Sequence, residues 1–173
     1  MDFWQVLKLR HSVRRFKDKE VSDDLIKKIL EAAILAPSAG NIQDWRFIII
    51  ENEKIKIKIA EMALGQTFIS RAPVVIIVCS DLAEIESAYG QRGRELYSAQ
   101  NTAAATQNLL LAVTALGLGA CWVGGFDEAR VSEILDLDEN WRPLAVVPIG
   151  YPSDRELEIH SRKKLSKVVK WIG

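Results

Sequence analysis

The most constraining feature of the sequence is a run of 31 residues, from Leu96 to Phe126, that contains no charged side chain. Its length alone would permit a membrane span. Serine, glutamine, asparagine and threonine fill its first half, however, and Gly117 and Gly119 interrupt its second half. These features predict instead a long helix over about residues 94–116 that is buried on all sides of a globular domain.

Hydrophobic periodicity divides the rest of the chain into helices and strands that do not alternate strictly. Asp2, Ser22, Asn52 and Asp127 are placed to cap the first turns of four helices. Strands are predicted over residues 46–51, 73–79, 120–125 and 142–152. This order favours an α+β fold over a doubly wound parallel sheet. With 173 residues, no repeat and no internal linker, we expect one domain over residues 1–173.

Positive charge is concentrated at the two ends of the chain. Residues 1–17 hold five Lys/Arg and one acid, and residues 159–173 hold five Lys/Arg and no acid, although the whole chain carries no net charge. A nucleic-acid-binding protein would more usually show an overall basic excess. Two small basic clusters are better suited to one phosphorylated small molecule.

Other compositional signals are weak. Cys79 and Cys121 lie in apolar surroundings without a C-x-x-C pair, so we expect two buried, reduced thiols. Two histidines, His11 and His160, are too few to indicate a histidine-based metal site, and no metal is expected. No signal peptide opens the chain, which favours the cytoplasm, and no membrane partner is expected.

Familiar nucleotide and hydrolase motifs are absent from the sequence. "GLGACW" has Trp122 where a dinucleotide fingerprint needs its third glycine, and it leads into a strand rather than a helix. Neither a P-loop nor a G-x-S-x-G elbow is present. Three polar, glycine-containing stretches and the two basic ends remain as candidates for a site.

These remaining stretches meet the physical demands of bound flavin mononucleotide (FMN). The FMN phosphate needs guanidinium or ammonium groups, and the ring needs amide-type partners at its pyrimidine edge, a cation near N1–C2=O and close backbone at N5. The candidates for the phosphate and N1 contacts are Arg10, Ser12 and Arg14. Those for the pyrimidine edge are Ser38, Asn41 and Gln43, and Gly124 and Gly125 could let the backbone approach the ring.

Each candidate also has a plain structural interpretation. Arg10 and Arg14 could simply offset a helix dipole. The polar residues at 38–43 could be ordinary turn formers. The two glycines could form a strand-to-helix turn, and the basic C-terminal residues could be a solvated tail. The residues alone leave these alternatives open.

Five stretches together resemble the FMN-dependent nitroreductase family. They are "RHSVRRF", "APSAGNIQDWRF", "ALGLGACWVGGF" followed by an acid-capped helix, "VVPIGYP" and "SRKKL". They follow the order and spacing of the family and span nearly the whole chain. The resemblance implies an α+β fold with a mixed, mainly antiparallel sheet flanked by helices. It further implies a homodimer with an exchanged C-terminal segment and two FMN sites at the subunit interface.

The resemblance also implies a reaction. Hydride passes from NAD(P)H through the tightly bound flavin to a small-molecule acceptor, such as a nitroaromatic or a quinone, by a ping-pong mechanism. No side chain acts as an acid or base, and Arg14 beside N1–C2=O tunes the flavin. The other cofactor contacts implied are Arg10, His11, Ser12, Arg162 and Lys164 at the phosphate, Pro37, Ser38, Asn41 and Gln43 from the partner subunit, Gln66 at the pyrimidine edge, and Val123, Gly124 and Gly125 beside the ring.

Two departures from the family pattern affect the predicted site. Gly124 stands where relatives often have an acid, which leaves more room beside the ring. Asp44 stands where they have proline, so we expect an acid close to the entrance of the site. Two alternative functions remain: a specialised flavin-dependent dehydrogenase, dehalogenase or flavin-fragmenting enzyme, and a non-catalytic flavin-binding protein.

Overall fold

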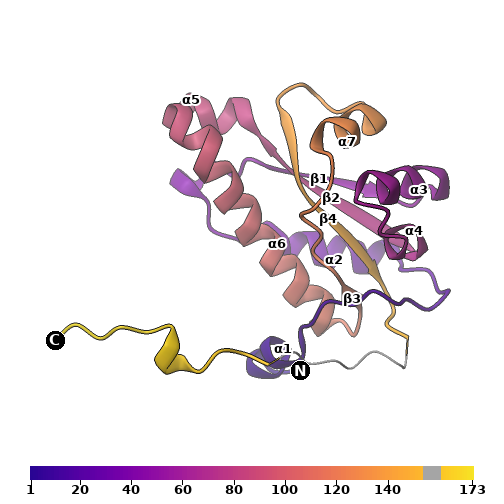
Figure 1. Ribbon diagram of the computed structural model, residues 1–173, viewed down its shortest axis with the longest axis horizontal. Helices are drawn as coiled ribbons and strands as arrows, with labels where there is room; N and C mark the ends of the chain where they lie inside the picture. Colours follow the sequence, from indigo (N-terminus) through magenta and orange to yellow (C-terminus); the bar gives the residue numbers. More distant parts are fainter. Residues whose placement is uncertain (154–160) are drawn as a thin grey trace.

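The protein is built on a four-stranded antiparallel sheet that helices cover on both faces (Figure 1). The computed structural model describes residues 1–153 and 161–173. The strands are β1 (Trp45–Ile50), β2 (Val74–Asp81), β3 (Gly119–Ala120) and β4 (Trp141–Gly150), in the order β1-β2-β4-β3. The predicted α+β class is therefore confirmed.

One face of the sheet is covered by α2 (Asp23–Ala33) and α6 (Ser98–Ala115). Successive side chains on a strand point to opposite faces, so Val74, Ile76 and Val78 of β2 share this layer. Ile29 of α2 and Leu109 of α6 are fully buried against them. The contact of α6 with the sheet explains why its inward residues carry no charge.

The opposite face is covered by α3 (Glu53–Met62), α4 (Phe68–Arg71) and α7 (Glu128–Leu135). Val75 and Ile77 of β2 contribute to this second core, together with Ile59 of α3 and Val131 of α7. Cys79 lies in this core as a free thiol, and burial raises its pKa to about 12. The prediction of buried, reduced cysteines is confirmed for both positions.

Three of the four predicted helix caps are confirmed by hydrogen bonds. The side chains of Asp2, Asn52 and Asp127 each accept a hydrogen bond from the backbone N–H three residues later. Ser22 is the N-cap residue of α2, but its side chain makes no capping hydrogen bond. The helix α1 (Phe3–Leu9) that Asp2 begins has only Val6 buried.

The long uncharged segment departs from the sequence prediction in three ways. A π-helical turn at Gly93–Tyr97 joins the preceding helix α5 (Leu82–Arg92) to α6, so α6 begins later than expected. The strand expected over 120–125 is reduced to β3 and a single bridge from Val123 to Val146. In one chain α6 is buried on its inward side only, because the sheet and α2 cover one side of it; residues such as Gln100 and Gln107 are exposed.

The C-terminal segment leaves the body of the molecule. Residues 161–173 are exposed throughout and contain a short 3-10 turn, Leu165–Lys167 (Figure 1). His160, where the predicted tail begins, lies outside the described residues. Among the helices that the structure describes, none has both the length and the apolar character that crossing a bilayer requires.

Candidate functional site

The basic N-terminal segment is held along the edge strand β3. Ser12 forms a parallel bridge with Ala120, and the Val13 backbone N–H donates to the Ala120 carbonyl oxygen at 2.9 Å. Val13 is 2% exposed and packs directly over Gly119, where a Cβ atom would lie 2.7 Å from a methyl group of Val13. Glycine at position 119 therefore lets residues 10–14 approach the sheet.

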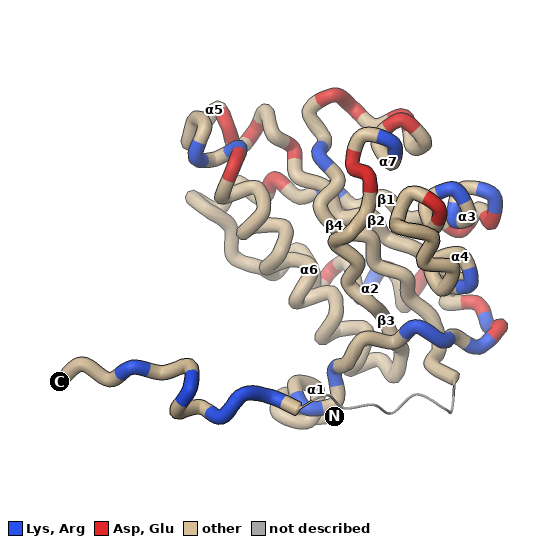
Figure 2. The backbone as a smooth tube through the Cα atoms, viewed as in Figure 1, with Lys and Arg blue, Asp and Glu red and all other residues tan. Residues whose placement is uncertain are grey.

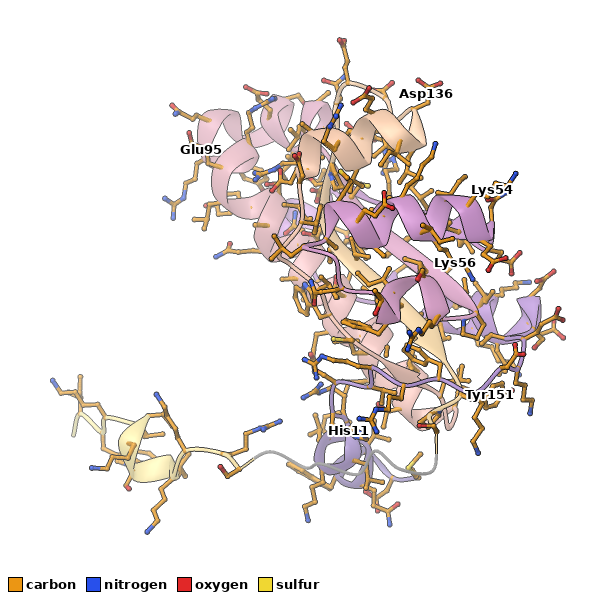
Figure 3. The ribbon with its side chains drawn as sticks, turned by 45° about the vertical axis from the view of Figure 1, so that its right-hand side comes forward. His11, Lys54, Lys56, Glu95, Asp136 and Tyr151 are labelled. Atoms are coloured by element: carbon orange, nitrogen blue, oxygen red, sulfur yellow. The ribbon has the colours of Figure 1, made fainter. Side chains whose placement is uncertain are left out.

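Two polar groups on this segment have no protein partner within the described chain. The Nδ1 atom of His11 lies 2.8 Å from the Leu9 carbonyl oxygen, whereas its Nε2 atom is buried without a hydrogen bond. The half-buried Arg10 forms no ion pair with the described residues. Figure 2 shows further Lys and Arg residues along the segment between α1 and α2, and Figure 3 shows His11 beside α1. The arrangement leaves the guanidinium donors of Arg10 available to an anion. The Nε2 atom of His11 is an acceptor while Nδ1 donates to the Leu9 carbonyl oxygen.

The connection between α3 and α4 lies next to the same segment. The Arg14 guanidinium carbon is 5.9 Å from the centre of the Phe68 ring. Leu64 also approaches Gly125, because a Cβ atom on that glycine would lie 3.5 Å from the Leu64 Cδ1 atom. The structure thus brings together residues 10–14, 64–68 and 123–125, which are far apart in the sequence.

The predicted residues in the 123–125 stretch differ in what they can offer. A Cβ atom on Gly124 would meet no atom within 4 Å, so the space beside this residue is open. Val123 is 4% exposed, and its backbone N–H and carbonyl groups pair with those of Val146 at 2.9 Å. Val123 therefore supports the stretch from the core, while the two exposed glycines face solvent.

Gln66 lies between Leu64 and Phe68. Its side-chain amide donates a hydrogen bond to the Ala63 carbonyl oxygen at 2.9 Å, which caps the end of α3. A contact from Gln66 to a ligand would use its amide oxygen or the second N–H of the amide. The sequence analysis missed Phe68 as a neighbour of Arg14 and Leu64 as a neighbour of Gly125, because nothing in their spacing distinguishes them from core residues.

The loop that carries Pro37, Ser38, Asn41 and Gln43 lies away from residues 10–14. It contacts the N-terminal half of α6, since the Ala39 backbone N–H donates to the Asn101 side chain at 2.9 Å. In Figure 1 the segment between α2 and β1 lies near the top of α6, whereas β3 lies near its lower end. One chain therefore does not bring these two groups of predicted residues together.

Asp44 does not lie at an entrance, and that prediction is wrong. Its side chain is 0% exposed and accepts hydrogen bonds from the Ser80 hydroxyl group and from the Asn101 amide. These two buried polar partners, on β2 and α6, draw the carboxyl group inward. Neither partner was identified from the sequence, because they lie far from Asp44 along the chain.

The C-terminal basic residues Arg162 and Lys164 lie on the exposed segment 161–173. Figure 2 shows this segment extending from the body with several basic residues along it. Their meeting with Arg10 at one phosphate stays a prediction.

A separate hollow of about 870 Å³ contains none of the predicted cofactor residues. It lies between residues 16–23 and the α3–α4–β2 region, and charged side chains of both signs line it. Lys56 in its wall donates hydrogen bonds to the carbonyl oxygens of Ala72 at 2.7 Å and Pro73 at 3.0 Å (Figure 3). Desolvation lowers the pKa of Lys56, against the opposing effect of Glu53 and Glu51. The lysine tethers α3 to the start of β2.

The chain is similar over most of its length to proteins of one family. The model of the nitroreductase family matches residues 7–70 and 63–151. A protein of Methanothermobacter thermautotrophicus, provisionally named NADH dehydrogenase/NAD(P)H nitroreductase, is 39% identical over 89% of this chain and 79% of its own length. An NADH dehydrogenase of Thermus thermophilus is 32% identical over 94% of this chain and 92% of its own length. The crystal structure of a nitroreductase family protein from Streptococcus pneumoniae has a TM-score of 0.91 at 27% identity and covers 99% of this chain and 100% of that one.

Proposed function

The chain belongs to the nitroreductase family, and on this basis we propose that it is an FMN-dependent NAD(P)H oxidoreductase that reduces nitroaromatics, quinones or related acceptors. The observation that carries the proposal is the convergence of residues 10–14, 64–68 and 123–125, with the basic residues Arg10 and Arg14 in the first stretch and the exposed glycines at 124 and 125 in the last. Bound FMN supplies the redox chemistry, by accepting a hydride from NAD(P)H and passing electrons to the acceptor in a ping-pong sequence.

The residues present fit the two ends of FMN. Arg10 and Ser12 donate hydrogen bonds to the phosphate, since charge-assisted hydrogen bonds to phosphate oxygens are strong. Because Nδ1 of His11 donates to the Leu9 carbonyl oxygen, its Nε2 atom donates to the phosphate only in the doubly protonated imidazole. Arg14 lies beside the N1–C2=O edge, where its positive charge stabilises the reduced ring. Phe68 and Leu64 exclude water from one side of the ring. The exposed backbone at Gly124 and Gly125 approaches N5 and leaves room for a nicotinamide.

The site is completed by a second copy of the chain. Ser38, Asn41 and Gln43 reach the pyrimidine edge from the partner, together with Pro37, because within one chain their loop lies at the other end of α6. Arg162 and Lys164 join the phosphate through exchange of the C-terminal segment. Large exposed apolar side chains support a homodimer: Trp4 is 69% exposed, Trp171 89% and Ile172 86%.

The visible spectrum of the purified protein is the primary test. We expect a yellow protein that absorbs at about 450 nm, that NADH or NADPH bleaches without oxygen, and that an added quinone or nitroaromatic recolours. A colourless preparation that takes up no added FMN would overturn the proposal. A yellow protein that NAD(P)H does not bleach would instead be a non-catalytic flavin protein, and slow NAD(P)H oxidation with every acceptor would indicate a specialised relative.

The dimer has its own test. We expect sedimentation of the FMN-loaded protein as a particle of twice the 19.4 kDa chain mass. A 19.4 kDa particle that still retains FMN would contradict the shared site.

A further inference from the structure

We propose that Asp44 and Asn101 form a positioning pair that holds the loop of residues 38–43 in the conformation that contacts the cofactor. The proposal rests on the proposed function, because it assigns this loop to the pyrimidine edge of FMN. It concerns two buried polar residues that do not themselves reach the cofactor.

The pair is buried and fully bonded. Asp44 is 0% exposed and Asn101 is 4% exposed. The Asn101 Nδ2 atom donates to the Asp44 Oδ1 atom at 2.6 Å, and the Ser80 hydroxyl group donates to the second Asp44 oxygen. The Asp44 backbone carbonyl also accepts from the Asp81 N–H at 2.6 Å, which ties the residue to the end of β2.

Asp44 determines which way the Asn101 amide faces. An amide side chain has a donor end and an acceptor end, whereas the Asp44 oxygen that it meets is an acceptor. The NH₂ group of Asn101 therefore turns towards Asp44, and its oxygen turns towards Ala39. There it accepts the Ala39 backbone N–H at 2.9 Å. Asp44, which follows the loop, therefore fixes Ala39 near the beginning of the loop through the Asn101 side chain.

The loop between these two anchors has an unusual backbone. Asn41 and Gln43 have φ values of +58°, and Gly40 has a φ of +55°. Left-handed conformations of residues other than glycine persist only where the surrounding structure holds them. Ala39 directly precedes this strained stretch and Asp44 directly follows it. A hydrogen bond from the Gln43 N–H to the Ser38 hydroxyl oxygen, at 3.0 Å, closes the loop from within.

This geometry connects the pair to binding. Ser38, Asn41 and Gln43 are the loop residues assigned to FMN, and Asn41 and Gln43 are two of the strained ones. If either anchor is released, these residues relax from their left-handed conformation, and their side chains leave the positions from which they bind. Asp44 and Asn101 are thus positioning residues rather than catalytic ones.

The polar chemistry of the pair allows a swap experiment. Asn101→Asp keeps an acceptor for Ala39 but places two carboxyl groups against each other, so the hydrogen bond to Asp44 is lost. Adding Asp44→Asn restores a donor and an acceptor: the new amide donates to the carboxylate at position 101 and accepts from Ser80. Asn52→Asp is a matched control, because it makes the same chemical change at a helix cap that either side chain can form.

Two measurements test the proposal. The first is hydrogen exchange of the loop peptide in the FMN-free protein, and the second is the FMN dissociation constant from quenching of flavin fluorescence. For Asn101→Asp we expect loop exchange ~10-fold faster and FMN binding ~10-fold weaker, as for the loss of one buried hydrogen bond to a charged group. Exchange in β2 should not change. The double variant should recover both values to within about threefold of the unaltered protein, and Asn52→Asp should leave both unchanged.

Three results would overturn the proposal. They are loop exchange that accelerates without any loss of FMN affinity, loop exchange that does not change, and a double variant that folds but recovers neither value. These three results are obtained with an unaltered protein that binds FMN. If the unaltered protein does not bind FMN, the proposed function itself is overturned.

Discussion

Gly119→Ala is the substitution that most directly tests how residues 10–14 are held. A Cβ atom on Gly119 would lie 2.7 Å from Val13 Cγ2 and 2.8 Å from both Val13 Cβ and Val13 Cγ1. Rotation of the valine side chain cannot remove all three contacts, because one of them is to Cβ. Val13 is itself 2% exposed, so the strain has to move the backbone of the segment away from β3.

The magnitude follows from the cost of overpacking a core. One added methyl group in a filled site typically destabilises a protein by about 1–3 kcal/mol. In a chain of this size, each kcal/mol lowers the midpoint of thermal unfolding by roughly 2–4 °C. The displaced segment carries Arg10 and Ser12, and loss of one charge-assisted hydrogen bond to the phosphate would weaken FMN binding by ~10-fold.

Urea unfolding of the FMN-free protein measures the first effect, and a fluorescence titration with FMN measures the second. Gly124→Ala is the control for stability, because nothing lies within 4 Å of its added Cβ atom; we expect a change within about 0.5 kcal/mol. Val13→Ala removes both Cγ atoms, so the two substitutions together should cost less than the sum of each alone. Additive costs, or a Gly119→Ala variant as stable as the unaltered protein, would refute the packing of Val13 on Gly119.

Three further outcomes are expected. Because burial lowers the pKa of Lys56 from 10.5, the unfolded chain holds this proton more tightly, and stability should rise with pH across the window between the lowered pKa and 10.5. Lys56→Met should flatten that rise in urea midpoints measured between about pH 8 and 10. Cys79, whose pKa is raised to about 12, should not react with a disulfide reagent at about pH 8 until urea unfolds the protein. Arg14→Ala should lower the midpoint potential of the bound flavin by about 20–40 mV in anaerobic titrations, and an unchanged potential would remove its assigned role.

Features set by neighbouring residues were predictable from the sequence. The caps at Asp2, Asn52 and Asp127 depend on side chains that reach the backbone three residues later. The apolar run at residues 73–79 predicts a strand buried on both faces, and every residue of β2 from Val74 to Ser80 is buried. The α+β class followed from the order of these elements.

Features set by contacts between distant segments were not predictable. Asp44 follows a polar loop and was expected close to the entrance of the site, but it is buried with two partners at positions 80 and 101. Leu64 and Phe68 become part of the candidate site only because the α3–α4 connection brings Leu64 to Gly125 and Phe68 to Arg14. The spacing of residues along the sequence carries no information about contacts between distant segments. The resemblance to a family, in contrast, pointed to residues 10–14 and 123–125 as parts of one site.

The uncharged segment from Leu96 to Phe126 supports the proposed homodimer. A run of 31 residues without charge predicts a helix covered on every side, yet one chain covers only the inward side of α6. The same chain exposes Phe3 and Trp4 on α1, which contacts α6, and Trp171 at the C-terminus. Apolar surface of this extent on one subunit is typical of an interface. The proposed homodimer would account for both observations, because a second copy would cover the outer side of α6 and bring the loop of residues 38–43 to residues 10–14.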